Sequence, residues 1–282
     1  MSRPDRPTPP LPTFLIIGAQ KSATRWLRVN LGKHPDVFTA DHELAFFNKA
    51  GMIRRIGLEG YRAQFEGWDG EPVVGEATPG YMIWRHDPTD VARRIDRYLP
   101  EVRLIALLRN PIDRADSALM HHVRRRRLSS RTKLVKAVKK RKPEKDRLGL
   151  IAGGWYAASL RPYVRRFGQR LLVLLHDDIQ RNPAWVYQRA LRHIGAEPTY
   201  VPDGLESVVF SNRGTSERPA LTLDERRMLY TYFRDDVRRL QRIIGRNLSI
   251  WDPDHVPYVS EEPVEPIDPP APHVSPTAGS DR

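Results

Sequence analysis

The chain has 282 residues, and its 47 Lys and Arg against 34 Asp and Glu give a formal net charge of +13. The absence of cysteine excludes disulfide scaffolds, zinc–thiolate sites, iron–sulfur clusters and thiol nucleophiles, and 40% hydrophobic with 29% charged residues excludes a wholly disordered chain. No run of about 18 apolar residues occurs, and residues 1–7 lead directly into prolines. We therefore expect a cytoplasmic protein without a membrane span.

Prolines mark the two ends of the chain. Five of the 25 prolines fall in residues 1–12 and eight in residues 252–282, where apolar periodicity is also lost. We expect residues 1–12 to be disordered, and residues 252–282 to be disordered or to lie along the surface. The predicted folded unit is one domain over residues 13–251, without internal repeats.

Within that unit, apolar runs alternate with segments that have helical periodicity. In chain order, the sequence predicts a strand at Thr13–Ile17, a helix at Ser22–Leu31, strands at Val73–Glu76 and Val102–Leu108, a helix starting at Pro111, a helix at Gly154–Arg166, a strand at Leu171–Leu175, and helices at Pro183–Ile194 and Leu223–Ile244. This alternation predicts a three-layer α/β fold with a central parallel sheet covered by helices on both faces.

The loop after the first predicted strand has the features of an anion site. Residues 18–24 read GAQKSAT and join a strand to the start of a helix, where free backbone N–H groups and the helix dipole favour negative charge. Lys21 and two hydroxyl residues add donors. The Walker A pattern is absent, because no Gly stands directly before Lys21 and the spacing from Gly18 is too short.

A second anion site is predicted where the strongest strand ends. Arg109 follows Leu108 directly, Pro111 can occupy the first turn of a helix, and Ser117 lies about two turns along that helix. A guanidinium fork and a hydroxyl can together hold one phosphate. Two such sites on one sheet indicate a ligand with two separated phosphates.

One segment carries most of the charge. Residues 124–147 hold thirteen Lys and Arg against Glu144 and Asp146, a local net charge of +11. Two interpretations are open: a solvated helical insertion, or a patch that receives an acidic partner. We expect it to govern acceptor affinity with little influence on the donor site. Because the charge is confined to one segment without interleaved aromatic residues, we expect no nucleic-acid partner.

These motifs resemble the sulfotransferases that use 3′-phosphoadenosine-5′-phosphosulfate (PAPS), most closely the heparan-sulfate type. The resemblance covers about residues 14–251 and rests on FLIIGAQKSATRWL (14–27), HP (34–35), ELAFFN (43–48), LIALLRNPIDRADSALMHH (104–122), GWYA (154–157) and PALTLD (219–224), in that order. It implies a P-loop-like fold, and a sulfuryl transfer to a hydroxyl or amine of a carbohydrate or small metabolite. The product of the donor would be adenosine 3′,5′-bisphosphate (PAP).

The resemblance also assigns residues that bind the donor. The phosphosulfate loop corresponds to Gln20, Lys21, Ser22, Ala23, Thr24 and Arg25; the 3′-phosphate site to Arg109 and Ser117; a nearby aromatic to Tyr156; and a loop that closes over the donor to Asn212, Arg213 and Gly214. Two positions depart from the family pattern, because Ala23 stands where the family has Gly and Arg25 where it has a second hydroxyl.

The resemblance implies that catalysis uses Lys21, Glu43 and His121. Lys21 would stabilise charge on the leaving phosphate, Glu43 would act as general base, and His121 would lie near the acceptor and could take the base role instead. No carboxylates or histidines are spaced as metal ligands, so we expect no metal. Two other functions remain open at this point: a P-loop-like nucleotide kinase or phosphotransferase, and a basic nucleic-acid-binding protein.

Overall fold

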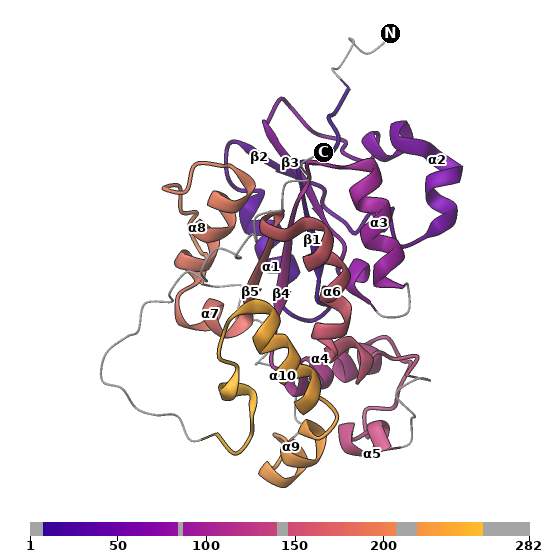
Figure 1. The fold of residues 1–282 in the computed structure, drawn as a ribbon, viewed down its shortest axis with the longest axis vertical. Helices are drawn as coiled ribbons and strands as arrows, with labels where there is room; N and C mark the ends of the chain where they lie inside the picture. Colours follow the sequence, from indigo (N-terminus) through magenta and orange to yellow (C-terminus); the bar gives the residue numbers. More distant parts are fainter. Residues whose placement is uncertain (1–7, 84–86, 140–145, 207–218, 256–282) are drawn as a thin grey trace, which may run out of the picture.

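The computed structural model describes residues 8–83, 87–139, 146–206 and 219–255. At the centre lies a five-stranded sheet in the order β2-β3-β1-β4-β5, with every neighbouring pair parallel. The strands are β1 (Phe14–Gly18), β2 (Val37–Thr39), β3 (Val73–Ala77), β4 (Arg103–Leu108) and β5 (Leu171–Leu175). Helices lie on both sides of the sheet (Figure 1), so the predicted three-layer α/β class is confirmed.

Alternate residues of each strand pack into different cores. In β1, Phe14 and Ile16 join a cluster with α1 (Thr24–Leu31) and α8 (Pro183–Ile194). Leu15 and Ile17 instead join the larger cluster, which includes side chains of α2 (Ala50–Arg62), α3 (Pro88–Tyr98) and α6 (Tyr156–Phe167). All four β1 side chains are fully buried. This two-sided burial explains why the strand is a continuous apolar run.

The remaining α-helices lie mostly toward the carboxyl ends of the strands (Figure 1). They are α4 (Pro111–Arg124), α5 (Leu134–Lys139), α7 (His176–Arg181), α9 (Leu223–Tyr230) and α10 (Arg234–Ile244). The start of α4 follows the predicted logic: the Asn110 side chain accepts a hydrogen bond from the Ile112 N–H at 3.0 Å, and Pro111 occupies the first turn.

One segment predicted to be a single helix forms two helices instead. The segment Leu223–Ile244 forms α9 and α10, separated at residues 231–233, where Phe233 is buried. A capping box between Thr222 and Glu225 starts α9. The interruption lets α9 pack against α4 and α5 while α10 packs against α6. Tertiary packing therefore overrides the helical periodicity of this segment.

The ordered chain extends past the predicted limits of the domain. Pro12 is buried and Leu11 packs against the larger core, although both fall in the segment expected to be disordered. After residue 251, Asp254 forms an ion pair with Arg227 of α9. The elements β2, α2, α3, α5 and α7 were not predicted from the sequence.

The described parts of the basic segment are attached to the fold. Helix α5 buries Leu134, Ala137 and Val138. After residues 140–145, the Asp146 Oδ2 atom accepts the N–H groups of Ile151 at 2.6 Å and Ala152 at 3.0 Å. The turn that follows is also bound to α4, whose buried Arg114 donates to the carbonyls of residues 149 and 150 at 2.7 Å each. This segment is therefore more than a solvated insertion.

Candidate active site

The loop between β1 and α1 exposes backbone donors at the carboxyl end of the sheet. Lys21 and Ala23 both adopt left-handed backbone conformations, with φ of 70° and 69°. Ala23 provides no side-chain cap for α1, so the first amides of the helix have no side-chain acceptor there. Unpaired N–H groups at a helix start favour binding of an anion. The loop therefore has the backbone arrangement that the sequence predicted.

Two buried hydroxyl groups meet beneath this loop. The Ser22 side chain is fully buried, and among the described residues its Oγ atom has no hydrogen-bond partner of acceptable geometry, although it lies beside the Tyr156 hydroxyl. Tyr156 donates to the Arg109 carbonyl at 2.8 Å. A buried hydroxyl without a partner is costly, and a ligand oxygen can satisfy it. Ser22 therefore fits a phosphate-type group.

The two predicted anion sites lie next to each other. Arg109 leaves the end of β4, and its Nη1 atom donates to the Lys21 carbonyl at 3.5 Å. Ser117 is half-buried on α4, one turn before His121 and two turns before Arg124, so these three residues share a helix face. Arg109 therefore contacts the loop that contains Lys21, and Ser117 lies on the face of α4 that carries His121 and Arg124, both of which act on or respond to the charge of Lys21.

Electrostatic coupling shows that Lys21, Glu43 and His121 form one cluster. Burial is the largest cause that lowers the pKa of Lys21, followed by the positive charges of Arg124 and Arg109, whereas Glu43 raises it. Burial raises the pKa of Glu43, and nearby cations including Lys21 oppose the rise. Burial, followed by the charge of Lys21, lowers the pKa of His121 to about 4. His121 is therefore a neutral imidazole near pH 7.

Sequence reasoning did not assign several cations of this cluster to the site. Arg124 acts on Lys21 and His121, Arg125 acts on Glu43, and Arg28 of α1 also acts on Glu43. Arg28 donates to the Ala40 carbonyl at 2.7 Å, near the chain that leads to Glu43. Arg124 of the basic segment therefore lies within electrostatic reach of Lys21, whereas we expected that segment to have little influence on the donor site. The signal for its role is its helical spacing from Ser117 and His121.

The other predicted residues differ in their surroundings. Gln20 lines a small pocket of about 130 Å³ together with Tyr156, His122 and Arg127. Thr24 is buried at the start of α1, whereas Arg25 is exposed on that helix. The predicted loop residues Asn212, Arg213 and Gly214 lie outside the described residues. Among the described residues, no three His, Asp or Glu side chains are grouped to hold a metal ion.

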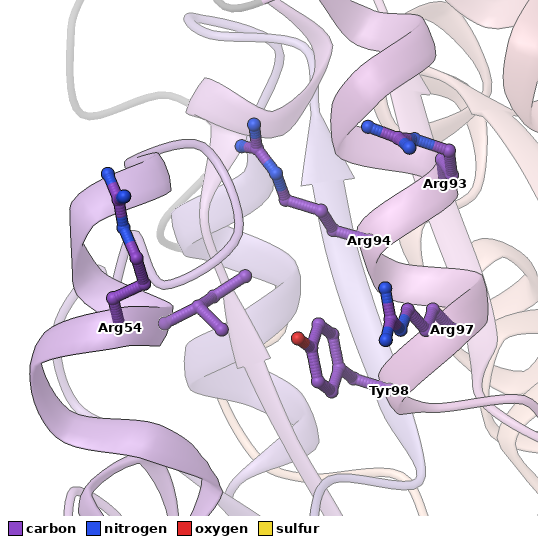
Figure 2. A pocket seen from close by; sticks show the side chains of 6 residues that line it. Arg54, Arg93, Arg94, Arg97 and Tyr98 are labelled. Carbon is purple, nitrogen blue, oxygen red and sulfur yellow. The ribbon is translucent and has the colours of Figure 1, made fainter.

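A larger pocket lies between α2 and α3 (Figure 2). Its volume is about 380 Å³, and it is lined by Ile53, Arg54, Arg93, Arg94, Arg97 and Tyr98. Figure 2 shows Arg54 on the opposite side of the pocket from the arginines of α3. Asp90 pairs with both Arg93 and Arg94. Because no predicted donor residue lines this pocket, we do not assign the donor to it.

Comparison with known proteins identifies the family. The family model described as the sulfotransferase domain matches residues 11–216. The chain belongs to this family. A crystal structure of a sulfotransferase from Alicyclobacillus acidocaldarius aligns with a TM-score of 0.71 and 29% identity, covering 86% of this chain and 99% of that chain. The predicted sulfotransferase resemblance and P-loop-like fold are thus confirmed.

Curated relatives of this sulfotransferase-family chain include heparan sulfate enzymes. Human bifunctional heparan sulfate N-deacetylase/N-sulfotransferase 3 is 24% identical over 279 residues, covering 86% of this chain and 31% of that protein. Human heparan sulfate glucosamine 3-O-sulfotransferase 6 is 36% identical over 106 residues, covering 38% of this chain and 29% of that protein. The matches span about a third of these relatives. No helix in the described ranges is long and apolar enough to cross a membrane.

Proposed function

We propose that this protein is a sulfotransferase that transfers the sulfuryl group of PAPS to a hydroxyl or amine of a carbohydrate or small-metabolite acceptor. The observation that carries the proposal is the meeting of Lys21 and Arg109 at the buried Ser22 hydroxyl, which has no partner of acceptable geometry in the described part of the chain, with Glu43 in electrostatic reach of Lys21. Cations and free donors fit the two phosphate groups of PAPS. The Glu43 carboxylate, within electrostatic reach of Lys21, fits a general base.

The donor would be held by two groups of residues. Lys21, Ser22, Thr24 and the first amides of α1 would bind the 5′-phosphosulfate, and Arg109 with Ser117 would bind the 3′-phosphate. PAPS supplies an activated sulfuryl group whose leaving atom is a phosphate oxygen. The Ser22 hydroxyl, which has no partner of acceptable geometry in the described chain, would gain one from the bound donor.

Catalysis by these side chains requires proton removal and charge stabilisation. Glu43 would accept the proton of the acceptor hydroxyl or amine as the new bond to sulfur forms and the bond from sulfur to the phosphate oxygen breaks. The Lys21 ammonium would donate a hydrogen bond to that departing oxygen. Because partial desolvation raises the pKa of Glu43 above its ordinary value, its basicity is greater than that of a fully hydrated carboxylate. The neutral state of His121 makes it the second candidate for the base.

A carbohydrate acceptor is supported by the names of the relatives and by the local charge. Two of those relatives are named for sulfation of heparan sulfate. The basic segment of residues 124–147 would attract an anionic acceptor of that type. The kinase alternative lacks a Walker A loop, and the nucleic-acid alternative lacks aromatic residues interleaved with the basic ones.

The first test is donor binding. PAP should bind the wild-type protein more tightly than ATP does, and duplex DNA should bind weakly, with an affinity that falls steeply between two salt concentrations. Arg109→Ala should weaken PAP binding roughly 30-fold, because it removes a charged hydrogen bond worth about 2 kcal/mol. The control is Arg192→Ala, an exposed arginine on α8. Unchanged PAP binding in Arg109→Ala would contradict the assignment of the second anion site.

The second test is catalysis with PAPS and desulfated heparan sulfate as acceptor. Glu43→Gln keeps the side-chain shape but cannot accept a proton, so kcat should fall by about two or more orders of magnitude while PAP affinity stays nearly constant. Glu59→Gln, at an exposed position of α2, is the matched control. Near-normal turnover of Glu43→Gln would transfer the base role to His121, which His121→Gln then tests.

A further inference from the structure

A second carboxylate lies buried in the strand beside the donor loop. Glu76 of β3 is fully buried, and β3 pairs directly with β1. Its Oε1 atom accepts hydrogen bonds from the Tyr81 hydroxyl at 2.6 Å and the Tyr61 hydroxyl at 3.3 Å, and its Oε2 atom accepts one from Thr78 at 2.7 Å. A buried carboxylate is costly unless it is well satisfied. Three converging hydroxyl groups reduce that cost.

Two of these hydroxyl groups also hold the segment that carries Glu43. The Thr78 Oγ1 atom accepts the Ala45 N–H at 3.1 Å, and the Tyr81 hydroxyl accepts the Phe46 N–H at 3.2 Å. A backbone N–H can only donate, so each hydroxyl must direct its own hydrogen toward Glu76. Glu76 therefore fixes the direction of both hydrogen-bond chains.

The same segment also contains a residue in an unfavourable backbone conformation and a further hydrogen bond to its backbone. Ala45 has a φ of 53°, a conformation that non-glycine residues rarely adopt without support. Two residues later, the carbonyl of Phe47 accepts a hydrogen bond from Arg94 of α3 at 2.8 Å. Three successive residues after Leu44 are thus fixed through their backbone atoms.

We propose that Glu76 is a positioning residue for Glu43: through Thr78 and Tyr81 it fixes the backbone of residues 45 and 46, and so holds the Glu43 carboxylate beside Lys21. The inference rests on the proposed role of Glu43. It adds a residue that touches neither donor nor acceptor, yet sets the geometry of the proton transfer. Misplacing a catalytic group by a small distance lowers kcat far more than it lowers donor affinity.

The test uses isosteric variants that each remove one hydroxyl group of the Glu76 network. Thr78→Val removes the link to Ala45, and Tyr81→Phe removes the link to Phe46. The matched control is Tyr61→Phe, which removes a hydroxyl partner of Glu76 and keeps the ring that packs on Phe46 and Phe47. We expect kcat to fall at least tenfold in Thr78→Val and Tyr81→Phe and to change less than twofold in Tyr61→Phe, with PAP affinity within twofold of wild type in all three.

A measurement independent of turnover accompanies the kinetics. Hydrogen exchange of the peptide covering residues 43–48 should become faster in Thr78→Val, Tyr81→Phe and Glu76→Gln, and should stay unchanged in Tyr61→Phe. Melting temperatures identify any general loss of stability. If kcat falls in proportion to the melting temperature in all variants including Tyr61→Phe, the network only stabilises the fold and the inference is wrong.

A double-mutant cycle separates this inference from the proposed function. In the Glu43→Gln background, Thr78→Val should cause little further loss of kcat, because the group that it positions is already inactive. Fully additive losses would overturn the positioning role of Glu76 while leaving Glu43 as the base. Near-normal turnover of Glu43→Gln alone would instead overturn the base assignment.

Discussion

Ala23 adopts a left-handed backbone conformation, with φ 69° and ψ 19°, at the position where related donor loops have glycine. An alanine methyl group is unfavourable in this region by about 1 kcal/mol or more. Ala23→Gly should therefore stabilise the protein by roughly 1 kcal/mol, a rise of about 2–4 °C in melting temperature. Calorimetry of the two proteins measures the difference.

The matched control for this substitution is Ala158→Gly. Ala158 is exposed on α6, so glycine there should lower the stability by about 0.5–1 kcal/mol. If both substitutions lower the stability, the loop is not strained at Ala23. PAP titration of Ala23→Gly then shows whether the departure from the family pattern affects the donor site.

Glu76 also gives the protein a dependence of stability on pH. Burial raises its pKa to about 7, while its three hydroxyl partners lower it and the charge of Glu43 raises it further. Since the ordinary pKa of a Glu carboxyl, as in the unfolded chain, is 4.5, the folded state binds the proton more tightly. The associated stability is present below about pH 4.5 and is lost as the pH rises through 7.

Replacing Glu76 by glutamine should remove this dependence. Between pH 4.5 and 8, the wild-type protein should lose up to about 3 kcal/mol of unfolding free energy that Glu76→Gln does not lose. Denaturant titrations at several pH values measure both proteins. Parallel pH profiles of wild type and Glu76→Gln would show that the group titrates outside this range.

At the scale of elements, α4 carries several candidate site residues, including Ser117, His121 and Arg124. Its exposed end carries Arg124, whose charge acts on both Lys21 and His121. Arg124→Gln should raise the pKa of Lys21 and weaken PAP binding about three- to tenfold, with a smaller loss at high salt. Arg126→Gln, which changes the charge equally at an exposed position two residues away, is the control. Equal effects of the two substitutions would indicate only a general charge effect.

The sequence predicted the elements with simple patterns and missed those shaped by packing. β4 and β5 are uninterrupted apolar runs, so their positions were clear. β2 has only three residues, and α2 contains Gly57 in a non-helical conformation with φ 61°, which weakens its periodicity. The break between α9 and α10 has no glycine or proline to mark it.

The candidate site also has residues that simple sequence patterns predicted and residues that only the folded structure brings together. Lys21 and Arg109 follow predicted strands directly, so their convergence could be expected from parallel topology. Glu76 interrupts the apolar pattern of a short strand, and its hydrogen-bond partners include Tyr61 and Tyr81, which lie fifteen residues before it and five after it. Only the fold brings these hydroxyl groups together, so their network could not be predicted from spacing.

At the scale of the whole molecule, the charge is distributed unevenly. The net charge is +13, and residues 124–147 account for +11 of it. Replacing Lys133, Lys136 and Lys139 by serine should weaken binding of an anionic acceptor such as heparan sulfate, and should flatten its salt dependence, with little change in PAP affinity. Affinity measurements at two salt concentrations test this.

The control removes the same charge elsewhere. Serine replacements at the exposed residues Arg161, Arg165 and Arg192 lower the net charge equally on other helices. Equal losses of acceptor affinity in both triple variants would assign the effect to net charge. An unchanged affinity in the lysine variant would show that the described part of the segment does not contact the acceptor.

The basic segment is fixed to the fold by separate contacts before and after residues 140–145. The buried face of α5 holds one side, and the hydrogen bonds of Asp146 and Arg114 hold the other. Lengthening the chain between two fixed points costs little, about 0.6 kcal/mol for each doubling of the length. Insertions, deletions or grafted sequences between these anchors should therefore leave α4 in register. Sequence changes confined to the stretch between these anchors should accordingly leave the Lys21 loop, and with it the PAP affinity, unchanged.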